Sequence, residues 1–206
     1  GVVPTGHALP YVALLRKEPY LLAARNNDHS YPEVISMEIW DAYYADGTPA
    51  GCDLVRGEPI PEGLYHLVSD ILVRHRDGDY LLMQRDPRKP NYGGCFEATA
   101  GGSALKGEDA DTCAKRELRE ETGIAEGELT PISRYVHRDT IYIQYLCITG
   151  QDKASVTLQE GETVAYRWLT ESEFVAFVNS EEMIPRQRER YRAYYRQMGY
   201  LTSTVE

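Results

Sequence analysis

The sequence has few of the features expected of a protein that binds nucleic acid. It has 22 Lys and Arg residues against 32 Asp and Glu residues, which gives a formal net charge of −10. A chain with this excess of negative charge lacks the electrostatic attraction that holds proteins on a nucleic-acid backbone. The same excess predicts that a polyanionic substrate would need a local cation.

Long apolar runs and clustered cysteines are also absent. No run reaches the length that spans a membrane, and no charged-then-apolar signal peptide is present. The four cysteines, Cys52, Cys95, Cys113 and Cys147, are widely scattered, which favours free thiols over a disulfide framework or a zinc site. We therefore expect a cytoplasmic protein without membrane or nucleic-acid partners.

The stretch from residue 101 to residue 124 concentrates acidic side chains behind a pair of glycines. Gly101 and Gly102 suit a sharp turn or a close approach of the backbone to a ligand. Good helix formers without proline predict a helix over residues 109–122, and acidic residues at its start suit the helix dipole. Gly123 stands where a helix C-terminal stop is expected.

Three glutamates of this helix, Glu117, Glu120 and Glu121, are spaced i, i+3 and i+4 and so share one face. Their carboxylates repel one another unless a cation lies between them, and Mg²⁺ prefers oxygen ligands. Arg116 is placed to hydrogen-bond a glutamate. The alternative is a solvated acidic helix end with Arg116 and Arg119 in ordinary surface pairs.

The whole span resembles the signature of the Nudix hydrolase family, which reads G, five residues, E, seven residues, REU, any residue, EE, any residue, GU, where U is a bulky aliphatic. All nine specified positions match: Gly102, Glu108, Arg116, Glu117, Leu118, Glu120, Glu121, Gly123 and Ile124. A looser resemblance, to Nudix proteins with an isopentenyl-diphosphate-isomerase-like layout, runs from Met37 to Leu169.

The resemblance implies an α/β/α sandwich on a mixed sheet and a hydrolase acting on phosphorus anhydrides. The implied substrate is a nucleoside diphosphate linked to a further group, or a similar small molecule, and the implied cofactor is Mg²⁺ or Mn²⁺. The implied metal ligands are glutamates and one backbone carbonyl: Glu117, Glu120, Glu121 and Gly102. Arg116 matches the residue that orients a glutamate, and Glu108 and Gly123 match supporting positions.

The general base is open, because the family takes it either from this helix or from a later loop. Glu120 or Glu121 is the default. In the later loop, Glu160 or Glu162 is a candidate distal ligand or base, against the alternative of an ordinary acidic loop. Three cations, Arg85, Arg88 and Lys89, precede the signature and are candidates for phosphate binding, although solvated loop charges are an equal alternative.

The remaining pattern predicts strands and two further helices. Hairpin signals at Asp46-Gly47 and Asp77-Gly78 separate strands over 38–44, 53–56, 65–75 and 80–84. Further strands are expected over 96–100, 129–137, 140–149 and 163–168, with 129–137 paired to 140–149. Thr170 and Glu173 predict a capped helix to residue 178. A last amphipathic helix is expected over 185–198.

In that last helix the expected buried residues are Ile184, Tyr191, Tyr194, Tyr195 and Met198. Its arginines are expected to solvate the outer face: Arg186, Arg188, Arg190, Arg192 and Arg196. We expect residues 37–206 to form the hydrolase domain. Residues 1–36 are expected to form an extension that packs on this body or on a second copy in a homodimer.

Two rival functions remain. An isopentenyl-diphosphate isomerase needs a cysteine, accompanied by a histidine, in the strand leading into the signature. In this chain Gly101 stands at the position of the cysteine and Ser103 at that of the histidine. Cys95 comes too early in the chain to serve. A non-catalytic nucleotide-binding module is the second rival, but such modules usually lose signature carboxylates and this chain retains them all.

Overall fold

The computed structural model describes residues 37–202 of the chain. The predicted N-terminal extension, and any part it takes in a homodimer, lies outside these residues. The chain divides into a unit Gly1–Met37 and a second unit Glu38–Glu206, and the fold below is that of the second unit. In the described part of the chain, no helix is both long enough and apolar enough to cross a membrane.

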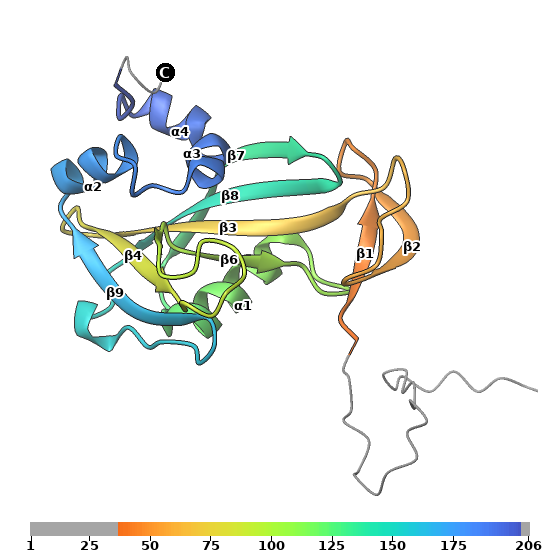
Figure 1. Ribbon diagram of the computed structural model, residues 1–206, viewed down its shortest axis with the longest axis horizontal. Helices are drawn as coiled ribbons and strands as arrows, with labels where there is room; N and C mark the ends of the chain where they lie inside the picture. Colours follow the sequence, from red (N-terminus) through yellow and green to blue (C-terminus); the bar gives the residue numbers. More distant parts are fainter. Residues whose placement is uncertain (1–36, 203–206) are drawn as a thin grey trace, which may run out of the picture. The chain divides into compact units, whose positions relative to one another are not determined.

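A seven-stranded mixed sheet forms the centre of this unit (Figure 1). Its strands are β3 (His66–His75), β4 (Tyr80–Arg85), β5 (Phe96–Glu97), β6 (Ala100–Ser103), β7 (Glu128–His137), β8 (Thr140–Thr149) and β9 (Thr163–Leu169). The order is β5-β4-β3-β8-β7, with β6 paired to β3 and β9 paired to β4. Only β3 and β8 run parallel among these pairs. The predicted pairing of residues 129–137 with 140–149 is confirmed.

Helices cover both faces of the sheet, which confirms the predicted α/β/α sandwich (Figure 1). On one face α1 (Ala110–Thr122) packs Ala114 and Leu118 into a core cluster with Ile71 of β3. On the other face lie α2 (Glu171–Val178), α3 (Pro185–Arg190) and α4 (Arg192–Gln197). Leu72, the next residue of β3, packs into their cluster, because successive strand residues point to opposite faces.

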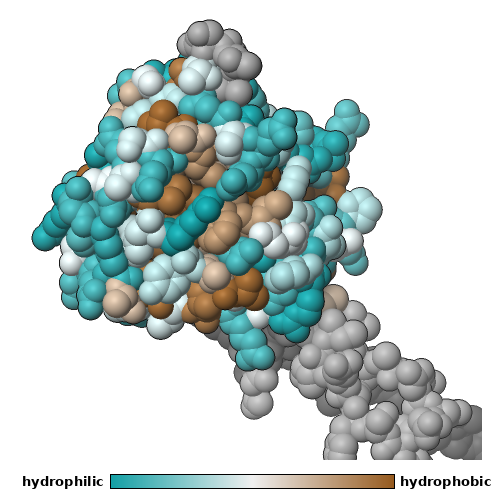
Figure 2. All heavy atoms as spheres, turned by 60° about the vertical axis from the view of Figure 1, so that its left-hand side comes forward, coloured by the Kyte–Doolittle hydropathy of each residue, from teal (hydrophilic) through white to brown (hydrophobic). Residues whose placement is uncertain are grey.

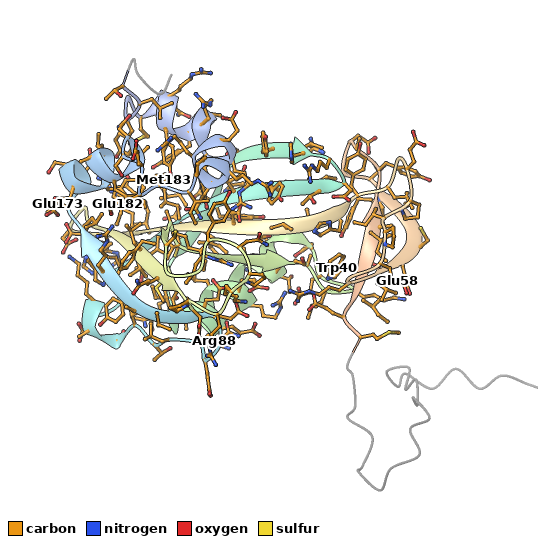
Figure 3. The ribbon with its side chains drawn as sticks, in the orientation of Figure 1. Trp40, Glu58, Arg88, Glu173, Glu182 and Met183 are labelled. Carbon is orange, nitrogen blue, oxygen red and sulfur yellow. The ribbon has the colours of Figure 1, made fainter. Side chains whose placement is uncertain are left out.

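Two further elements complete the unit. A hairpin of β1 (Ile39–Tyr43) and β2 (Pro49–Val55) turns at Gly47, whose φ of 94° is the left-handed conformation that glycine adopts without strain. Its own small core contains Trp40 (labelled in Figure 3), Ala42 and Leu54. A short 3₁₀ turn, Lys153–Ser155, precedes β9.

The C-terminal cap of α1 is the predicted one, whereas its first residue is Ala110 and not Asp109. Asp109 is the N-cap, and its side chain accepts a hydrogen bond from the Thr112 amide at 2.8 Å. Gly123 has a φ of 71°, and its amide bonds the Arg119 carbonyl at 2.9 Å. The Thr170–Glu173 capping box of α2 is also present. These caps set the length of the helix that carries the three glutamates.

The expected single strand over residues 96–100 is wrong. Phe96 and Glu97 pair with β4, whereas β6 pairs with β3. Between them, the Ala98 amide donates to the Gln187 side chain at 2.9 Å and the Thr99 hydroxyl donates to the Leu81 carbonyl at 2.7 Å. The chain therefore changes its pairing partner at residues 98–99, and two short strands result.

The expected single helix over residues 185–198 is also wrong in part. α3 ends at Arg190 and α4 begins at Arg192, with Tyr191 between them. Four of the five residues expected to be buried are buried, but Met198 is 38% exposed. Met198 is the C-cap of α4, and Tyr200 beyond it supplies the buried contact instead, with its hydroxyl 2.9 Å from that of Tyr80.

Two arginines of this region do not solvate the outer face as expected. Arg188 Nε donates to the Val178 carbonyl at 2.6 Å, so Arg188 caps the C-terminal end of α2. Arg190 Nε lies 3.1 Å from Oδ2 of Asp70, a buried residue of β3. Buried Met183, labelled in Figure 3, lies in the segment between α2 and α3. The sequence pattern could not distinguish inward from outward arginines on such short helices.

On the face of the molecule shown in Figure 2, patches of hydrophobic residues lie between hydrophilic ones. Among residues 37–202 the large hydrophobic side chains that are exposed include Val164 of β9 and Leu158 of the loop before it. Such single exposed residues are normal for a folded domain. The cavities described below are lined mainly by polar side chains.

Candidate active site

The strand β6 brings two glycines against α1. A Cβ atom on Gly102 would lie 2.2 Å from Oε1 of Glu117, so a side chain there would displace this carboxylate. Neither Gly101 nor Gly102 has a positive φ, and both belong to the strand. The alternative of a sharp turn is therefore wrong, and the close approach that the structure shows is to the Glu117 side chain.

The three glutamates of α1 line one cavity of about 380 Å³ together with Gly102. Glu120 is exposed, and Glu117 and Glu121 are partly buried. The spacing thus places the three side chains on one face, as predicted. The other polar residues of this cavity are Glu38, Arg56, Lys89, Ser103, Arg116, Gln159 and Glu162. We call it the catalytic cavity.

Arg116 connects the acidic residues of the cavity. Its Nε and Nη2 donate to Glu108 at 2.8 and 2.9 Å, and its Nη1 donates to Glu117 at 2.7 Å. Nη1 also lies 3.2 Å from Glu120. The bonds from Arg116 lower the pKa of Glu108. The predicted hydrogen bond from Arg116 to a glutamate of α1 is present, and Glu108 holds the guanidinium from its other side.

Negative charge is poorly compensated at Glu121. Burial, followed by the charges of Glu97 and Glu117, raises the pKa of Glu121 well above its usual range. The Gly101 amide, which donates to Glu121 at 3.2 Å, offsets this only in part. Burial also raises the pKa of Glu117, against the opposing effect of Arg116. A cation in the cavity would relieve this repulsion.

The donor set fits a hard divalent cation. Carboxylates and a backbone carbonyl are the oxygen ligands that Mg²⁺ and Mn²⁺ accept. Within residues 37–202 no group of three or more His, Cys, Asp or Glu side chains is gathered closely enough to hold an ion as it stands. Arg116 engages Glu117 and Glu120, so a cation would compete with Arg116 for these two side chains.

The later acidic loop contributes one of its two candidate glutamates. Glu162 lines the catalytic cavity and forms an ion pair with Lys89. Glu160 is exposed and does not line it. The structure therefore brings Glu162 and Lys89 together with the glutamates of α1, and leaves Glu160 outside.

The other two candidate cations lie elsewhere. Arg85 forms an ion pair with Glu97 at 2.8 Å and lines a second cavity. Arg88, labelled in Figure 3, pairs with Asp86 at 2.6 Å, and its side chain is 78% exposed. Arg88 lines neither cavity. Of the three cations in this loop, only Lys89 lies at the catalytic cavity.

Sequence reasoning missed Glu97 of β5. It pairs with Arg85, lines the second cavity, and raises the pKa of Glu121 through its charge. Because residues 96–100 were expected to form one continuous strand, no spacing argument singled out this glutamate. Its partner, twelve positions earlier in the chain, gave no local signal either.

The cysteines carry no acid–base group into the cavity. All four are free, and Cys95 lies in the loop before β5. The thiol nearest the site is that of Cys113, 3.4 Å from the Gly102 carbonyl. Burial raises the pKa of Cys113 to about 11, so this thiol stays protonated at neutral pH. This geometry does not favour the isomerase alternative.

Comparisons with known proteins agree on one family. The model of the NUDIX domain matches residues 64–194. An uncharacterized Nudix hydrolase of Listeria monocytogenes is 33% identical over 153 residues, which is 72% of this chain and 89% of the relative. The ADP-ribose pyrophosphatase of Saccharomyces cerevisiae is 41% identical over 70 residues, 33% of this chain and 29% of that protein.

Solved structures share the fold at low sequence identity. The protein DR0079 of Deinococcus radiodurans superposes with a TM-score of 0.56 at 17% identity, covering 68% of this chain and 88% of that one. The NUDIX domain of Shewanella oneidensis NrtR, complexed with ADP ribose, gives a TM-score of 0.51 at 13% identity. It covers 67% of this chain and 89% of that one.

Proposed function

Because the chain belongs to the Nudix hydrolase family, and is therefore a hydrolase acting on phosphorus anhydrides, we propose that it cleaves the diphosphate of a nucleoside diphosphate linked to a further group. The observation that carries this proposal is the catalytic cavity. In it, Glu117, Glu120 and Glu121 surround the same space as the Gly102 backbone and the Lys89 ammonium. A diphosphate needs both metal-binding oxygens and nearby cations, and this cavity offers both.

The residues that would hold Mg²⁺ or Mn²⁺ are the three glutamates and the Gly102 carbonyl. A bound ion of this kind supplies neutralising charge for phosphate oxygens and lowers the pKa of water. Glu108 and Arg116 support this set, since Arg116 fixes the Glu117 carboxylate at 2.7 Å and is itself held by Glu108. Lys89 is placed to meet a phosphate oxygen once Glu162 exchanges its ion pair.

The reaction transfers a phosphoryl or nucleotidyl group to water. The water oxygen bonds to phosphorus, the bridging P–O bond breaks, and the proton of the water passes to a carboxylate. We propose Glu120 or Glu121 as that base. Glu162 is the second candidate, because it lines the cavity from the later loop whereas Glu160 does not.

A screen with Mg²⁺ tests the proposal by chromatographic detection of the two phosphate esters into which cleavage divides each compound. ADP-ribose is the first compound to try, because the yeast relative is named as an ADP-ribose pyrophosphatase and the Shewanella domain was solved with ADP ribose. Nucleoside diphosphate sugars, dinucleoside polyphosphates and coenzyme A complete the panel. Failure to hydrolyse any of them in the presence of Mg²⁺ or Mn²⁺ would contradict the proposed substrate class.

Substitutions test the named residues. Glu120→Gln and Glu121→Gln should each lower kcat by about 10²–10⁴-fold without unfolding the protein, the range expected for loss of an acid–base group. Glu58→Gln is the matched control, because Glu58 is an exposed glutamate outside the cavity (Figure 3). Comparing Glu162→Gln with Glu160→Gln tests the later loop, since only Glu162 lines the cavity. Equal kinetics for these two variants would remove Glu162 from the site.

A further inference from the structure

A second cavity, of about 620 Å³, is lined by residues other than those of the catalytic cavity. Its walls come from the turn between β7 and β8, the loop before β5, and α3 with the residue before it. The loop between β4 and β5 contributes to both cavities, with Lys89 in the catalytic cavity and Asn91 and Tyr92 in this one. Its size is that of pockets that hold small organic ligands. We call it the distal cavity.

Positive charge in the distal cavity exceeds what its own carboxylates can neutralise. Four arginines line it but only two glutamates do, Glu97 and Glu189. Both glutamates are engaged, Glu97 with Arg85 at 2.8 Å and Glu189 with Arg192 at 2.8 Å. The remaining arginines therefore face the cavity without a carboxylate of its lining to balance them.

Two of these arginines are free to bind a ligand. Arg138, in the turn after β7, and Arg186, of α3, are exposed. Over residues 37–202 neither side chain has a hydrogen-bond or ion-pair partner. A guanidinium binds a phosphate through two parallel hydrogen bonds, which makes arginine the preferred residue for such a group. Two unpaired arginines on one cavity indicate an anion as its occupant.

A third arginine is fixed in place at the wall of the cavity. Arg190 lies 3.1 Å from buried Asp70, and its Cζ atom is 4.7 Å from the ring centroid of Tyr142. Its Nε is buried without a hydrogen bond. A charged side chain held between a carboxylate and a ring loses little entropy when a ligand binds, so Arg190 adds a preorganised positive charge.

Aromatic rings form another part of the lining. The Tyr135 ring lies 6.1 Å from that of Tyr142, and 6.1 Å from His137 with only 10° between the planes. Tyr92, from the loop before β5, is 41% exposed. Such rings offer flat apolar surfaces on which a planar ring can stack. The cavity thus combines a surface for a ring with cations for a phosphate.

We propose that the distal cavity binds the part of the substrate beyond the cleaved diphosphate, and that this part combines a planar ring system with a phosphate monoester of its own. Arg138 and Arg186 bind that additional phosphate, and Tyr135 and Tyr142 contact the ring. The inference rests on the proposed function of the catalytic cavity, which binds the diphosphate itself. A substrate without the additional phosphate would leave both arginines unpaired.

Matched pairs of compounds test this specificity. ADP-ribose is compared with ADP-ribose 2′-phosphate, and dephospho-coenzyme A with coenzyme A, so that each pair differs only in one phosphate monoester. For at least one pair, the wild-type kcat/KM should be about tenfold or more higher for the phosphorylated member, the effect of one charge-assisted hydrogen bond. Equal kcat/KM within both pairs overturns the inference but leaves the hydrolase proposal standing.

Variants assign the effect to the cavity. In Arg138→Ala/Arg186→Ala, the preference should fall to parity through a higher KM for the phosphorylated member, with little change for its partner compound. Arg134→Ala is the matched control, because Arg134 is an exposed arginine of β7 that lines neither cavity. A preference that survives in the double variant shows that the additional phosphate binds elsewhere, and overturns the inference.

A binding measurement separates the two proposals if no compound is hydrolysed. Calorimetry compares adenosine 2′,5′-bisphosphate and adenosine 3′,5′-bisphosphate with AMP, without metal. Tighter binding of at least one bisphosphate, lost in the double arginine variant, supports the inference even if the proposed hydrolysis fails. Equal binding of all three overturns it. Tyr135→Leu should weaken all three ligands alike, and unchanged binding in that variant overturns the assignment of the ring.

Discussion

The Glu117 carboxylate occupies the space that a side chain at residue 102 would need, since a Cβ on Gly102 would lie 2.2 Å from Glu117 Oε1. Gly102 has no left-handed φ, so its backbone conformation does not itself require glycine. The requirement comes from the approach of β6 to α1. Glycine is therefore required at this position because the Glu117 carboxylate of the catalytic cavity leaves no room for a side chain.

Gly102→Ala should lower activity much more than stability. The atoms that a new Cβ would meet are the far end of a flexible Glu117 side chain, which can rotate away. Displacing a reactive group by about 1 Å costs on the order of 10² in rate. We expect kcat to fall by about that factor while the thermal midpoint changes little. A large loss of stability with unchanged specific activity would contradict this account.

Gly101→Ala should have the opposite profile. Its Cβ would lie 2.7 Å from the Ser69 carbonyl oxygen and 3.1 Å from the Asp70 Cα, which belong to the backbone of β3 and cannot rotate away. Overpacking of this kind costs about 1–3 kcal/mol. For a chain of this size each kcal/mol lowers Tm by roughly 2–4 °C. Thermal unfolding of the two glycine variants, side by side, measures the contrast.

Glu121→Gln should raise the stability of the metal-free protein although it lowers turnover. Its carboxylate is partly buried near Glu97 and Glu117, with the Gly101 amide as its hydrogen-bond donor. A glutamine retains an oxygen for that amide and removes the repulsion. We expect a higher Tm without Mg²⁺, and a smaller rise of Tm when Mg²⁺ is added, because ligand binding stabilises the folded state. A lower metal-free Tm would show that this charge is not in conflict with its neighbours.

The composition of the site could be predicted from the sequence wherever one local element carries it. The positions of Glu117, Glu120 and Glu121 follow from helical spacing alone, and the caps at Asp109 and Gly123 set the limits of their helix. For the same reason the paired strands β7 and β8 could be predicted, whereas the α/β/α layering followed from the family resemblance. Periodicity is a property of consecutive residues, so it is visible without knowledge of tertiary contacts.

The remaining parts of the site depend on contacts between distant segments. Glu97 lines the distal cavity because the chain pairs with β4 up to that residue and with β3 only from Ala100. Arg190 faces inward because Asp70 of β3 offers a buried carboxylate. Neither contact can be predicted from the residues that are its neighbours in the sequence. Glu162 and Glu160 were equivalent in sequence, and only the fold of their loop distinguishes them. Likewise, only the ion-pair partners of Arg85, Arg88 and Lys89 show which of these three cations lies at the catalytic cavity.

Asp86 organises the loop before β5, and the charge of its carboxylate should make the stability of the protein depend on pH in the acidic range. Its carboxylate accepts from the Arg88 amide at 2.8 Å and from Arg88 Nη2 at 2.6 Å. The Arg88 side chain, with the Arg88 amide, lowers the pKa of Asp86 to about 2, from an ordinary value of 3.8. The lowered pKa means that the ionised carboxylate stabilises the folded state.

This contribution is therefore complete above pH 4 and is lost as the pH falls towards 2. Asp86→Asn should be less stable than the wild type at pH 7, and the difference should shrink on acidification, because the wild type loses the same interaction by protonation. Urea unfolding midpoints between pH 7 and pH 2 measure it. In an Arg88→Ala background the same substitution should have a smaller effect, since the partner is already gone. If the difference in stability between Asp86→Asn and the wild type stays constant over this range, the charge of Asp86 contributes nothing. Asp86 would then act only through its shape and its hydrogen bonds from backbone amides.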